Sequence, residues 1–375
     1  TSFYLPYYHV ISDNKDYTFK PQIFDSEIEM FQNEYRQVNE NSKFTADFGI
    51  TRGYQSSITG SKRNSIGHLF ASYDKDFQLK NFEKSEMKIN IESVSNDTFL
   101  SVFQNNLIKS NVKPNSTSSL KSGINFILDK EIFNFSTGVE VYENLSGSDS
   151  DRYEYIFPNY EFTKETFLEN KTFDALKFTS SGIFRKYNTN VDEGDFINDF
   201  VFNSNNEDEL KNLNKDFNIL LRNINTYGDL SNSYKEDADY KILTSAVYNL
   251  KYPLIKNTKS GKSLLTPMAS LRISPNKGLN IQNEDNLINF QDLFLVDRIS
   301  NKTIETGAAT TFGVEYKNYN SFSKERLSLG VGVNFRDKED KDLPLSTSLG
   351  QKTSDIIGYS GLNVTENLSF SYNFS

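Results

Sequence analysis

The sequence predicts an all-β protein: a large antiparallel transmembrane β-barrel, of which this chain contributes roughly 16–20 strands. Three observations lead to this prediction. Segments of about ten residues alternate between apolar and polar side chains, turn residues separate these segments, and no apolar run reaches the ~18 residues that a transmembrane helix requires. Because a strand places alternate side chains on opposite faces, each segment has one apolar face and one small or polar face.

The clearest alternation runs from Ile304 to Tyr316, where every second residue leans apolar and the residues between them are small or polar. In a barrel the apolar side faces lipid and the polar side lines a wet lumen. We therefore expect a set of apolar side chains on strands along the whole chain to point outward. This set is Phe44, Phe48, Phe133, Phe135, Val139, Leu329, Val331, Val333, Phe370 and Tyr372.

The composition agrees with a thin apolar wall. Of the 375 residues 36% are hydrophobic, whereas a soluble domain usually has about 45–50% apolar residues, counting Gly, to fill its core. Aromatic residues make up 14%, which argues against disorder. The chain has no Cys, which excludes disulfides and thiolate metal sites within it, and its net charge of −9 argues against nucleic acid as a partner.

Alternation and turn residues place twenty expected strands along one domain, residues 1–375. In order they are 2–11, 16–24, 27–38, 43–55, 64–78, 82–94, 97–109, 118–129, 132–144, 152–164, 172–187, 195–203, 216–228, 238–255, 263–274, 303–318, 323–336, 343–350, 354–365 and 366–375. The longest polar loop, Asn276–Asn301, is long enough to serve a function. Apolar residues at helical spacing in Glu207–Asn225 also fit an amphipathic helix; we favour a polar loop, 203–216, followed by a strand.

No group of residues predicts catalysis. The two histidines, His9 and His68, lie in no hydrolase or zinc motif, and we interpret both as polar strand residues. Gly330 and Gly332 are two residues apart, so they share one face of a strand and thin its lumen side instead of forming a phosphate loop. We expect no catalytic residue, no cofactor and no metal site, and therefore no enzyme.

Pro6 and Pro21 lie inside the first two expected strands. Proline cannot donate to a sheet ladder and belongs on an edge strand, at a strand start or at a bulge. Two such strands in succession indicate a weak seam. The alternative, that Pro6 begins a strand and Pro21 sits at a bulge, stays open.

Several segments also match a known family in order and spacing. The first of these segments contain Leu5-Pro6-Tyr7-Tyr8, Asn14, Asp16, Thr18, Pro21 and Glu34-Tyr35-Arg36. The later ones are Tyr155–Pro158, Tyr252–Leu254, Leu264–Pro267, Arg272–Pro275, Asp292–Ile299, Ile304–Gly307 and Phe312–Tyr316. With these segments the chain resembles, along nearly its whole length, the outer-membrane lipopolysaccharide-assembly (LptD) family, also called organic solvent tolerance proteins.

The resemblance implies the barrel domain of a Gram-negative outer-membrane protein of cell envelope biogenesis, without the family's N-terminal periplasmic jellyroll and its last strands. It implies lipopolysaccharide transport: lipopolysaccharide arrives over a periplasmic transport bridge, a lipoprotein plugs the lumen, and the lipid enters the outer leaflet through a lateral seam between the first and last strands. By residue match, Pro6 and Pro21 would weaken this seam, and Asn14, Asp16 and Thr18 would lie near it.

Two other functions stay open. A general porin or nutrient-uptake barrel fits the length, because ~16–18 strands suffice, and the Asn276–Asn301 loop would then fold inward as a constriction. An outer-membrane hydrolase would need a catalytic set such as His68 with a serine across the sheet. Residues 1–10 lack a signal peptide, so we expect that Thr1 is not the native start.

Overall fold

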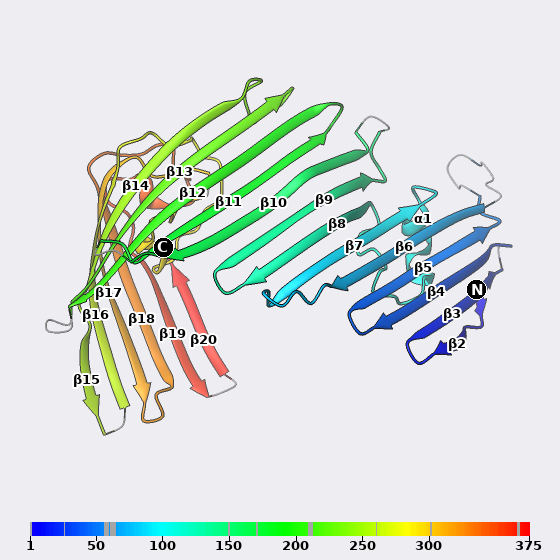
Figure 1. The fold of residues 1–375 in the computed structure, drawn as a ribbon, viewed down its shortest axis with the longest axis horizontal. Coiled ribbons are helices and arrows are strands. Elements are labelled where there is room, and N and C mark those ends of the chain that lie inside the picture. Colours follow the sequence, from blue (N-terminus) through cyan, green and yellow to red (C-terminus); the bar gives the residue numbers. More distant parts are fainter. Residues whose placement is uncertain are drawn as a thin grey trace. The chain divides into compact units, whose positions relative to one another are not determined.

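Figure 1 shows the computed structural model of the chain, which is almost entirely β. It describes residues 2–25, 27–55, 60, 65–148, 151–169, 172–208, 213–259, 261–300, 302–365 and 368–375. The short helices are α1 (Phe99–Phe103), η1 (Gln104–Asn106), η2 (Asp292–Phe294) and η3 (Ser348–Gly350). Within the described ranges, none of the helices has the length and apolarity needed to cross a membrane.

Within the described residues, twenty strands belong to one antiparallel sheet. Their bounds are β1 (Ser2–Tyr4), β2 (Tyr7–Ser12), β3 (Lys15–Phe24), β4 (Glu29–Asn39), β5 (Ser42–Arg52), β6 (Ser65–Asp76), β7 (Lys84–Val94), β8 (Ser119–Lys130), β9 (Phe133–Asn144), β10 (Tyr153–Phe167), β11 (Ala175–Tyr187), β12 (Val191–Asp208), β13 (Leu213–Asp229), β14 (Asp239–Lys251), β15 (Leu254–Thr258), β16 (Gly261–Ser274), β17 (Gly307–Asn320), β18 (Glu325–Arg336), β19 (Ile357–Thr365) and β20 (Leu368–Phe374). The predicted all-β antiparallel class is confirmed, with a strand count inside the predicted range.

Two of the expected strands are wrong. Residues 97–109 contain α1 and η1, because Phe99, Leu100 and Phe103 follow a helical spacing and are buried on one side. Residues 343–350 form turns and η3. Leu343 and Leu349, which would share the outward face of a barrel strand, are both buried.

Two strand breaks and one loop also differ from the prediction. The expected strands 2–11 and 238–255 are each broken at a proline, Pro6 and Pro253, into β1 and β2 and into β14 and β15. The loop expected at 203–216 is wrong, because β12 continues to Asp208 and β13 begins at Leu213. The strand interpretation of Glu207–Asn225 is therefore confirmed from Leu213 onward, and Leu210 lies outside the described residues.

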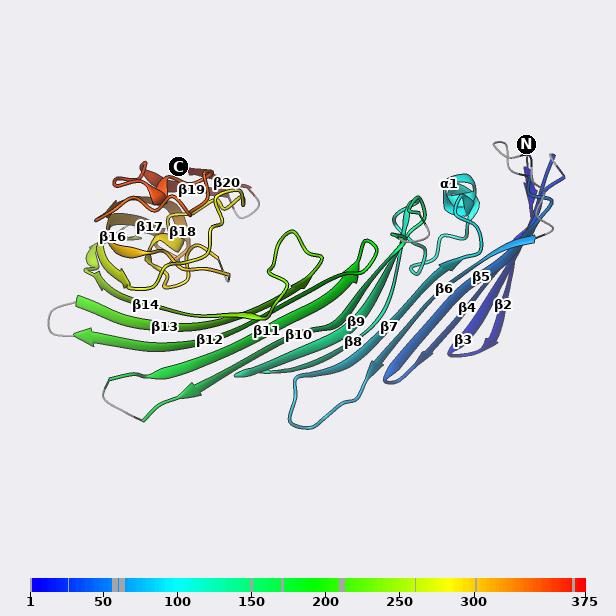
Figure 2. The same cartoon turned by 90° about the horizontal axis from the view of Figure 1, so that it is seen from above.

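The chain divides into two compact units, and the first comprises Thr1–Thr163, Ser181–Phe196 and Thr226–Asp239. In this unit each strand from β3 to β8 pairs antiparallel with the next. Residues 95–118, with α1, lie over one side of these strands, which we call the covered face of unit 1 (Figure 2). The core beneath them consists of Met30, Tyr54, Ile66, Phe70, Phe99, Leu100, Phe103, Leu107, Val112, Leu120 and Leu145.

The second unit comprises Lys164–Ser180, Ile197–Asn225 and Tyr240–Ser375. Residues 275–306 and 337–356 pack on one side of β16 to β19, the covered face of unit 2, around Phe290, Leu293 and Phe294. Glycines on the strands make room for these rings. A Cβ added at Gly332 would lie 2.8 Å from Leu293 Cδ1, and one at Gly330 would lie 2.8 Å from Phe290 Cδ1. The two glycines thus share a strand face, as predicted, and that face receives the loop.

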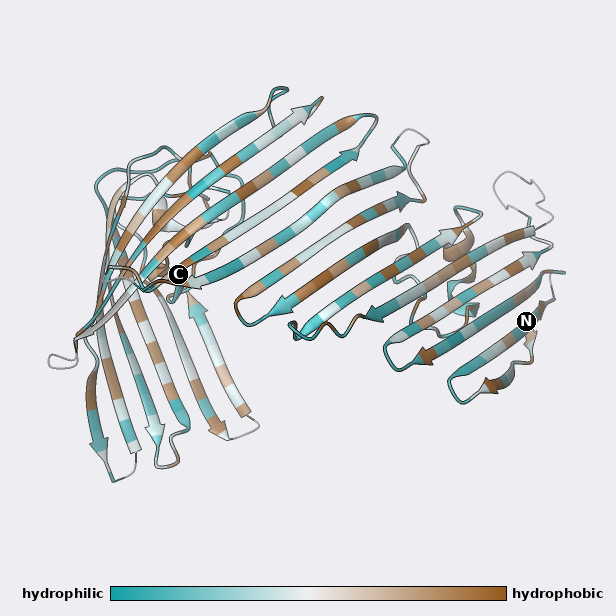
Figure 3. Ribbon diagram, in the orientation of Figure 1, coloured by the Kyte–Doolittle hydropathy of each residue, from teal (hydrophilic) through white to brown (hydrophobic). Residues whose placement is uncertain are grey.

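The two faces of the strands differ in character, and Figure 3 shows apolar and polar residues alternating along them. On β18, Leu329 and Val331 are each 40% exposed, whereas Ser328, Asn334 and Arg336 on the covered face are buried. None of the ten side chains predicted to point outward is buried. The separation of faces is thus present on β18, whereas on β20 every residue is exposed. Lipid contact on the open, uncovered face stays a prediction.

Candidate functional site

The first edge of the sheet is one strand interrupted at Pro6. Within the described residues, β1 and β2 pair with β3 and with no other strand. The register is the same on both sides of the break, since Tyr4 lies opposite Gln22 and Tyr7 lies opposite Phe19. Leu5 N still donates to the carbonyl of Pro21 over 3.3 Å. The edge strand therefore continues past Pro6 with its alignment intact.

The two prolines remove donors from different rows of hydrogen bonds. In an antiparallel ladder, a hydrogen-bonded pair of opposite residues exchanges two bonds. Leu5 and Pro21 form such a pair, but Pro21 has no N–H, so only the bond from Leu5 is made. Successive residues point their backbone groups to opposite sides of a strand, so the nitrogen of Pro6 faces away from β3, toward the free edge. Pro21 thus weakens the ladder behind the edge strand, and Pro6 weakens any pairing in front of it.

The other predicted seam residues lie on the β2–β3 hairpin. Asn14 is in its turn, where the side-chain amide donates to Asn39 Oδ1 over 3.0 Å. Asp16 on β3 accepts a 2.8 Å hydrogen bond from Arg36 Nε, and Thr18 lies opposite Tyr8. The structure thus brings these three residues and both prolines together on the first three strands or in the connections between them. Their role at a seam stays a prediction.

Unit 2 contains the same arrangement of prolines. Tyr252 N donates to the carbonyl of Pro267 over 3.0 Å, and Pro253 follows in the break between β14 and β15. The register again continues across the break, because Lys251 lies opposite Met268 and Leu254 opposite Leu265. We call the pairing of β1 and β2 with β3 the first proline ladder, and that of β14 and β15 with β16 the second proline ladder. The second is internal, since β14 also neighbours β13.

A loop residue on the covered face of unit 1 contacts the strands beside Pro21. The carbonyl of Asn106 accepts hydrogen bonds from Lys20 Nζ, at 2.6 Å, and from Gln32 Nε2, at 3.0 Å. Asn106 Oδ1 accepts one from Gln22 Nε2 at 3.2 Å. The prediction missed this contact because it placed a strand at 97–109; the helical spacing of Phe99, Leu100 and Phe103 was the available signal.

A buried ionic cluster holds the loops on the covered face of unit 2. Glu305, just before β17, accepts hydrogen bonds from Arg298 Nη2 at 2.8 Å and from Arg336 Nη1 at 2.6 Å. Arg272 on β16 donates to the carbonyl of Val296 at 2.8 Å. The side chains of Arg298, Arg336 and Glu305 are each 1% exposed. The sequence prediction missed this cluster, whose arginines come from separate segments.

The charges around Glu305 set its protonation. Burial by itself would raise the pKa of its carboxyl, but the guanidinium of Arg298, followed by those of Arg272 and Arg336, outweighs burial and lowers the pKa from 4.5 to about 2. The carboxylate thus stabilises the fold fully above pH 4.5, and its contribution is lost as the pH falls through about 2.

We expect the free energy of unfolding to decline by about 3 kcal/mol between pH 4.5 and pH 2 through Glu305 alone, because a tenfold change in proton affinity is worth about 1.4 kcal/mol. Urea titrations of the protein in phospholipid vesicles across this pH range measure the decline. In Glu305→Gln this component should be absent; an unchanged pH dependence in that variant would contradict the assignment.

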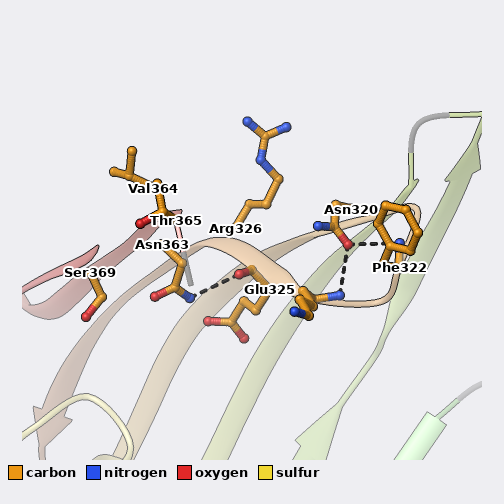
Figure 4. A pocket seen from close by; sticks show the side chains of 9 residues that line it. Asn320, Phe322, Glu325, Arg326, Asn363, Val364, Thr365 and Ser369 are labelled. Atoms are coloured by element: carbon orange, nitrogen blue, oxygen red, sulfur yellow. Dashed lines mark hydrogen bonds between the residues drawn. The ribbon is translucent and has the colours of Figure 1, made fainter. Parts of the chain in front are cut away.

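A large groove lies at the ends of two hairpins (Figure 4). Its volume is about 830 Å³, and it is lined by Asn320, Phe322, Lys324, Glu325, Arg326, Asn363, Val364, Thr365 and Ser369. Two of its polar side chains form hydrogen bonds with the backbone. Asn320 Oδ1 accepts one from Phe322 N at 2.9 Å, and Asn363 Nδ2 donates one to the carbonyl of Glu325 at 3.0 Å. Nowhere in the described ranges are three or more His, Asp or Glu side chains grouped to hold a metal. The first proline ladder is therefore the stronger candidate.

No protein-family model matches the chain, and no curated protein is similar enough to count as a relative.

Proposed function

We propose that the chain is the barrel domain of a bacterial outer-membrane transporter that passes lipopolysaccharide into the outer leaflet through a seam at β1 and β2. The observation that carries this proposal is the first proline ladder: an edge strand that keeps its register while Pro21 removes a bond behind it and Pro6 removes a donor in front of it. A ladder with missing donors opens at a lower free-energy cost than a complete one.

The side chains of the edge strand suit an amphiphile that moves across it. Phe3, Leu5 and Tyr7 have one parity and Tyr8 and Val10 the other, and all five are at least half exposed. Both faces of this strand are therefore apolar or aromatic, unlike β18. Acyl chains need apolar contact along the whole path from lumen to lipid, whereas tyrosine hydroxyls accommodate polar headgroups.

The proposal includes four partners and no chemical reaction. The cargo is lipopolysaccharide, delivered by a periplasmic lipopolysaccharide-transport bridge. A lipoprotein fills the lumen, and membrane lipid surrounds the open face. No bond is made or broken, so the function is transport and not catalysis.

Restoring both missing donors tests the seam. In Pro6→Ala/Pro21→Ala, the new backbone N–H at position 21 can bond the carbonyl of Leu5, and the new N–H at position 6 faces the strand that closes the edge. Each restored hydrogen bond contributes about 0.5–1.5 kcal/mol net. We therefore expect the population of the open state to fall by a factor of about ten or more. A photo-crosslinking residue at Tyr8, in the full-length protein in cells, should capture about tenfold less lipopolysaccharide, and delivery to the outer leaflet should slow.

The second proline ladder supplies a matched control. Pro253→Ala/Pro267→Ala makes the same chemical change in an internal ladder, so it should leave lipopolysaccharide crosslinking at Tyr8 unchanged. Both variants should assemble in the membrane in normal amounts. Equal crosslinking in the seam variant and the parent protein would show that the two prolines do not affect the passage of lipopolysaccharide. It would remove the main support for the proposal.

A porin is the second candidate, because residues 275–306 pack on the covered face of unit 2 as an inward constriction would. The same experiments separate the two functions. A porin gives steady ion conductance in planar bilayers and no lipopolysaccharide crosslink at Tyr8, in the parent protein or in either variant.

A further inference from the structure

We propose that residues 95–118 form a strap whose tip, at Asn106, reversibly holds β3 in place on the covered face, beside the proline that weakens its ladder. The strap deepens the proposed function, and its effect on transport rests on that function. Its effect on the stability of the first strands does not.

The body of the strap is fixed to the sheet by apolar packing. Phe99, Leu100 and Phe103 are buried against Met30 and Phe70 of β4 and β6. Burying side chains of this size stabilises a contact substantially. The strap is thus a rigid platform, and its tip, at Asn106, is held at a fixed place above β3 and β4.

The tip contacts the strands at the site of the missing ladder bond. Lys20 and Gln22 immediately precede and follow Pro21, and Gln32 lies opposite Lys20 on β4. All three donate to the single residue Asn106. Gln32 Oε1 also accepts a 2.8 Å hydrogen bond from Ile108 N. The strap therefore supplies hydrogen bonds to β3 where Pro21 has removed one.

The second proline ladder is braced in the same manner. Asn249 Nδ2 on β14 donates to the carbonyl of Phe294 at 3.0 Å, and Arg272 on β16 donates to Val296. Met268, next to Pro267, packs against the loop core. Gln22, Gln32, Asn249 and Arg272 are each less than 5% exposed, whereas Lys20 and Asn106 are only partly buried. Each proline ladder thus has a loop behind it, and in unit 1 water reaches the acceptor Asn106 and one of its three donors, Lys20.

Hydrogen exchange on the full-length protein in detergent micelles tests the strap without any transport assay. Gln32→Met keeps the size of the side chain but removes both of its bonds to the strap. We expect amides in β1 to β3 to exchange about tenfold faster, and those in β5 to β7 to keep their rates.

Tyr54→Phe is the matched control, because it removes one strap bond that involves neither Asn106 nor β3, between Tyr54 Oη and Thr98 Oγ1 at 2.7 Å. It should leave β1 to β3 unchanged. The strap is overturned if Gln32→Met leaves those strands unchanged, if it accelerates exchange evenly across β3 to β7, or if Tyr54→Phe has the same effect.

Locking the strap then links it to transport. The chain has no cysteine, so Gln22→Cys/Asn106→Cys can be joined by a short bifunctional thiol reagent. The locked protein should retain slow exchange in β1 to β3 and give about tenfold less lipopolysaccharide crosslinking at Tyr8 than the same variant before reaction. If the exchange results hold while the parent protein captures no lipopolysaccharide, the strap stands and the proposed function fails.

Discussion

Replacing Glu305 with Gln is expected to lower the free energy of unfolding by about 3–5 kcal/mol, because removing one partner of a buried ion pair leaves the others uncompensated. Three guanidinium groups surround this carboxylate: Arg298 and Arg336 bond to it, and Arg272 Nε lies 3.8 Å away. Gln offers only one acceptor oxygen and no charge, so like charges remain together out of water. Urea titration of the protein in phospholipid vesicles at pH 7 measures the loss.

Glu140→Gln is the control for this experiment. Glu140 pairs with Lys121 at 2.7 Å, but the lysine side chain is 48% exposed, and such pairs contribute only about 0–1 kcal/mol. We also expect faster amide exchange in residues 275–300 of the Glu305 variant, since the cluster holds that loop to the strands. Equal losses in the two variants would show that the cluster around Glu305 contributes no more than a surface ion pair.

Placing Arg at Val331 is expected to destabilise the protein by about 2–4 kcal/mol if the open face of β18 meets the middle of a lipid bilayer. Val331 lies at the centre of its strand, opposite Val314 and Gly358. If that face met water, an exposed position of this kind would tolerate Arg within about 0.5 kcal/mol. The free energy of unfolding in phospholipid vesicles therefore distinguishes a membrane-facing sheet from a water-facing one.

Phe322→Arg provides the comparison, since Phe322 is 83% exposed at the tip of the β17–β18 hairpin. That substitution should change the free energy of unfolding by less than about 1 kcal/mol. A spin label at Val331 gives an independent reading, with access to oxygen but not to a water-soluble relaxation agent. Access to the water-soluble agent would overturn the assignment of the open face.

The strands were predictable where one face is packed and the other is open. On β18 the two-residue period follows directly from that asymmetry, so its bounds agree closely with the prediction. The prediction of a strand at 97–109 was wrong because the apolar residues of this segment pack against the covered face of other strands. Short apolar runs are also compatible with both strand and helix. The breaks at Pro6 and Pro253 could not be predicted from the pattern of one strand, because locating them requires the register with the neighbouring strand.

The candidate site was predictable only in part, for a related reason. Pro6 and Pro21 stand out in the sequence because proline has one clear consequence in a strand. Gln32 and Asn106 do not, because either residue fits many exposed positions and acquires its role from a partner distant in the chain. The same holds for Glu305, whose partners Arg272 and Arg336 lie on opposite sides of it in sequence.

That last arrangement has a consequence for the order of assembly. Residues 275–306 are synthesised before β18, yet Glu305 needs Arg336, at the end of β18, to complete its set of partners. Phe290 and Leu293 likewise rest against Gly330 and Gly332 of that strand. The loop therefore acquires its final structure only after the strand that follows it has joined the sheet. A docked loop thus indicates that this part of the sheet has formed in the correct register.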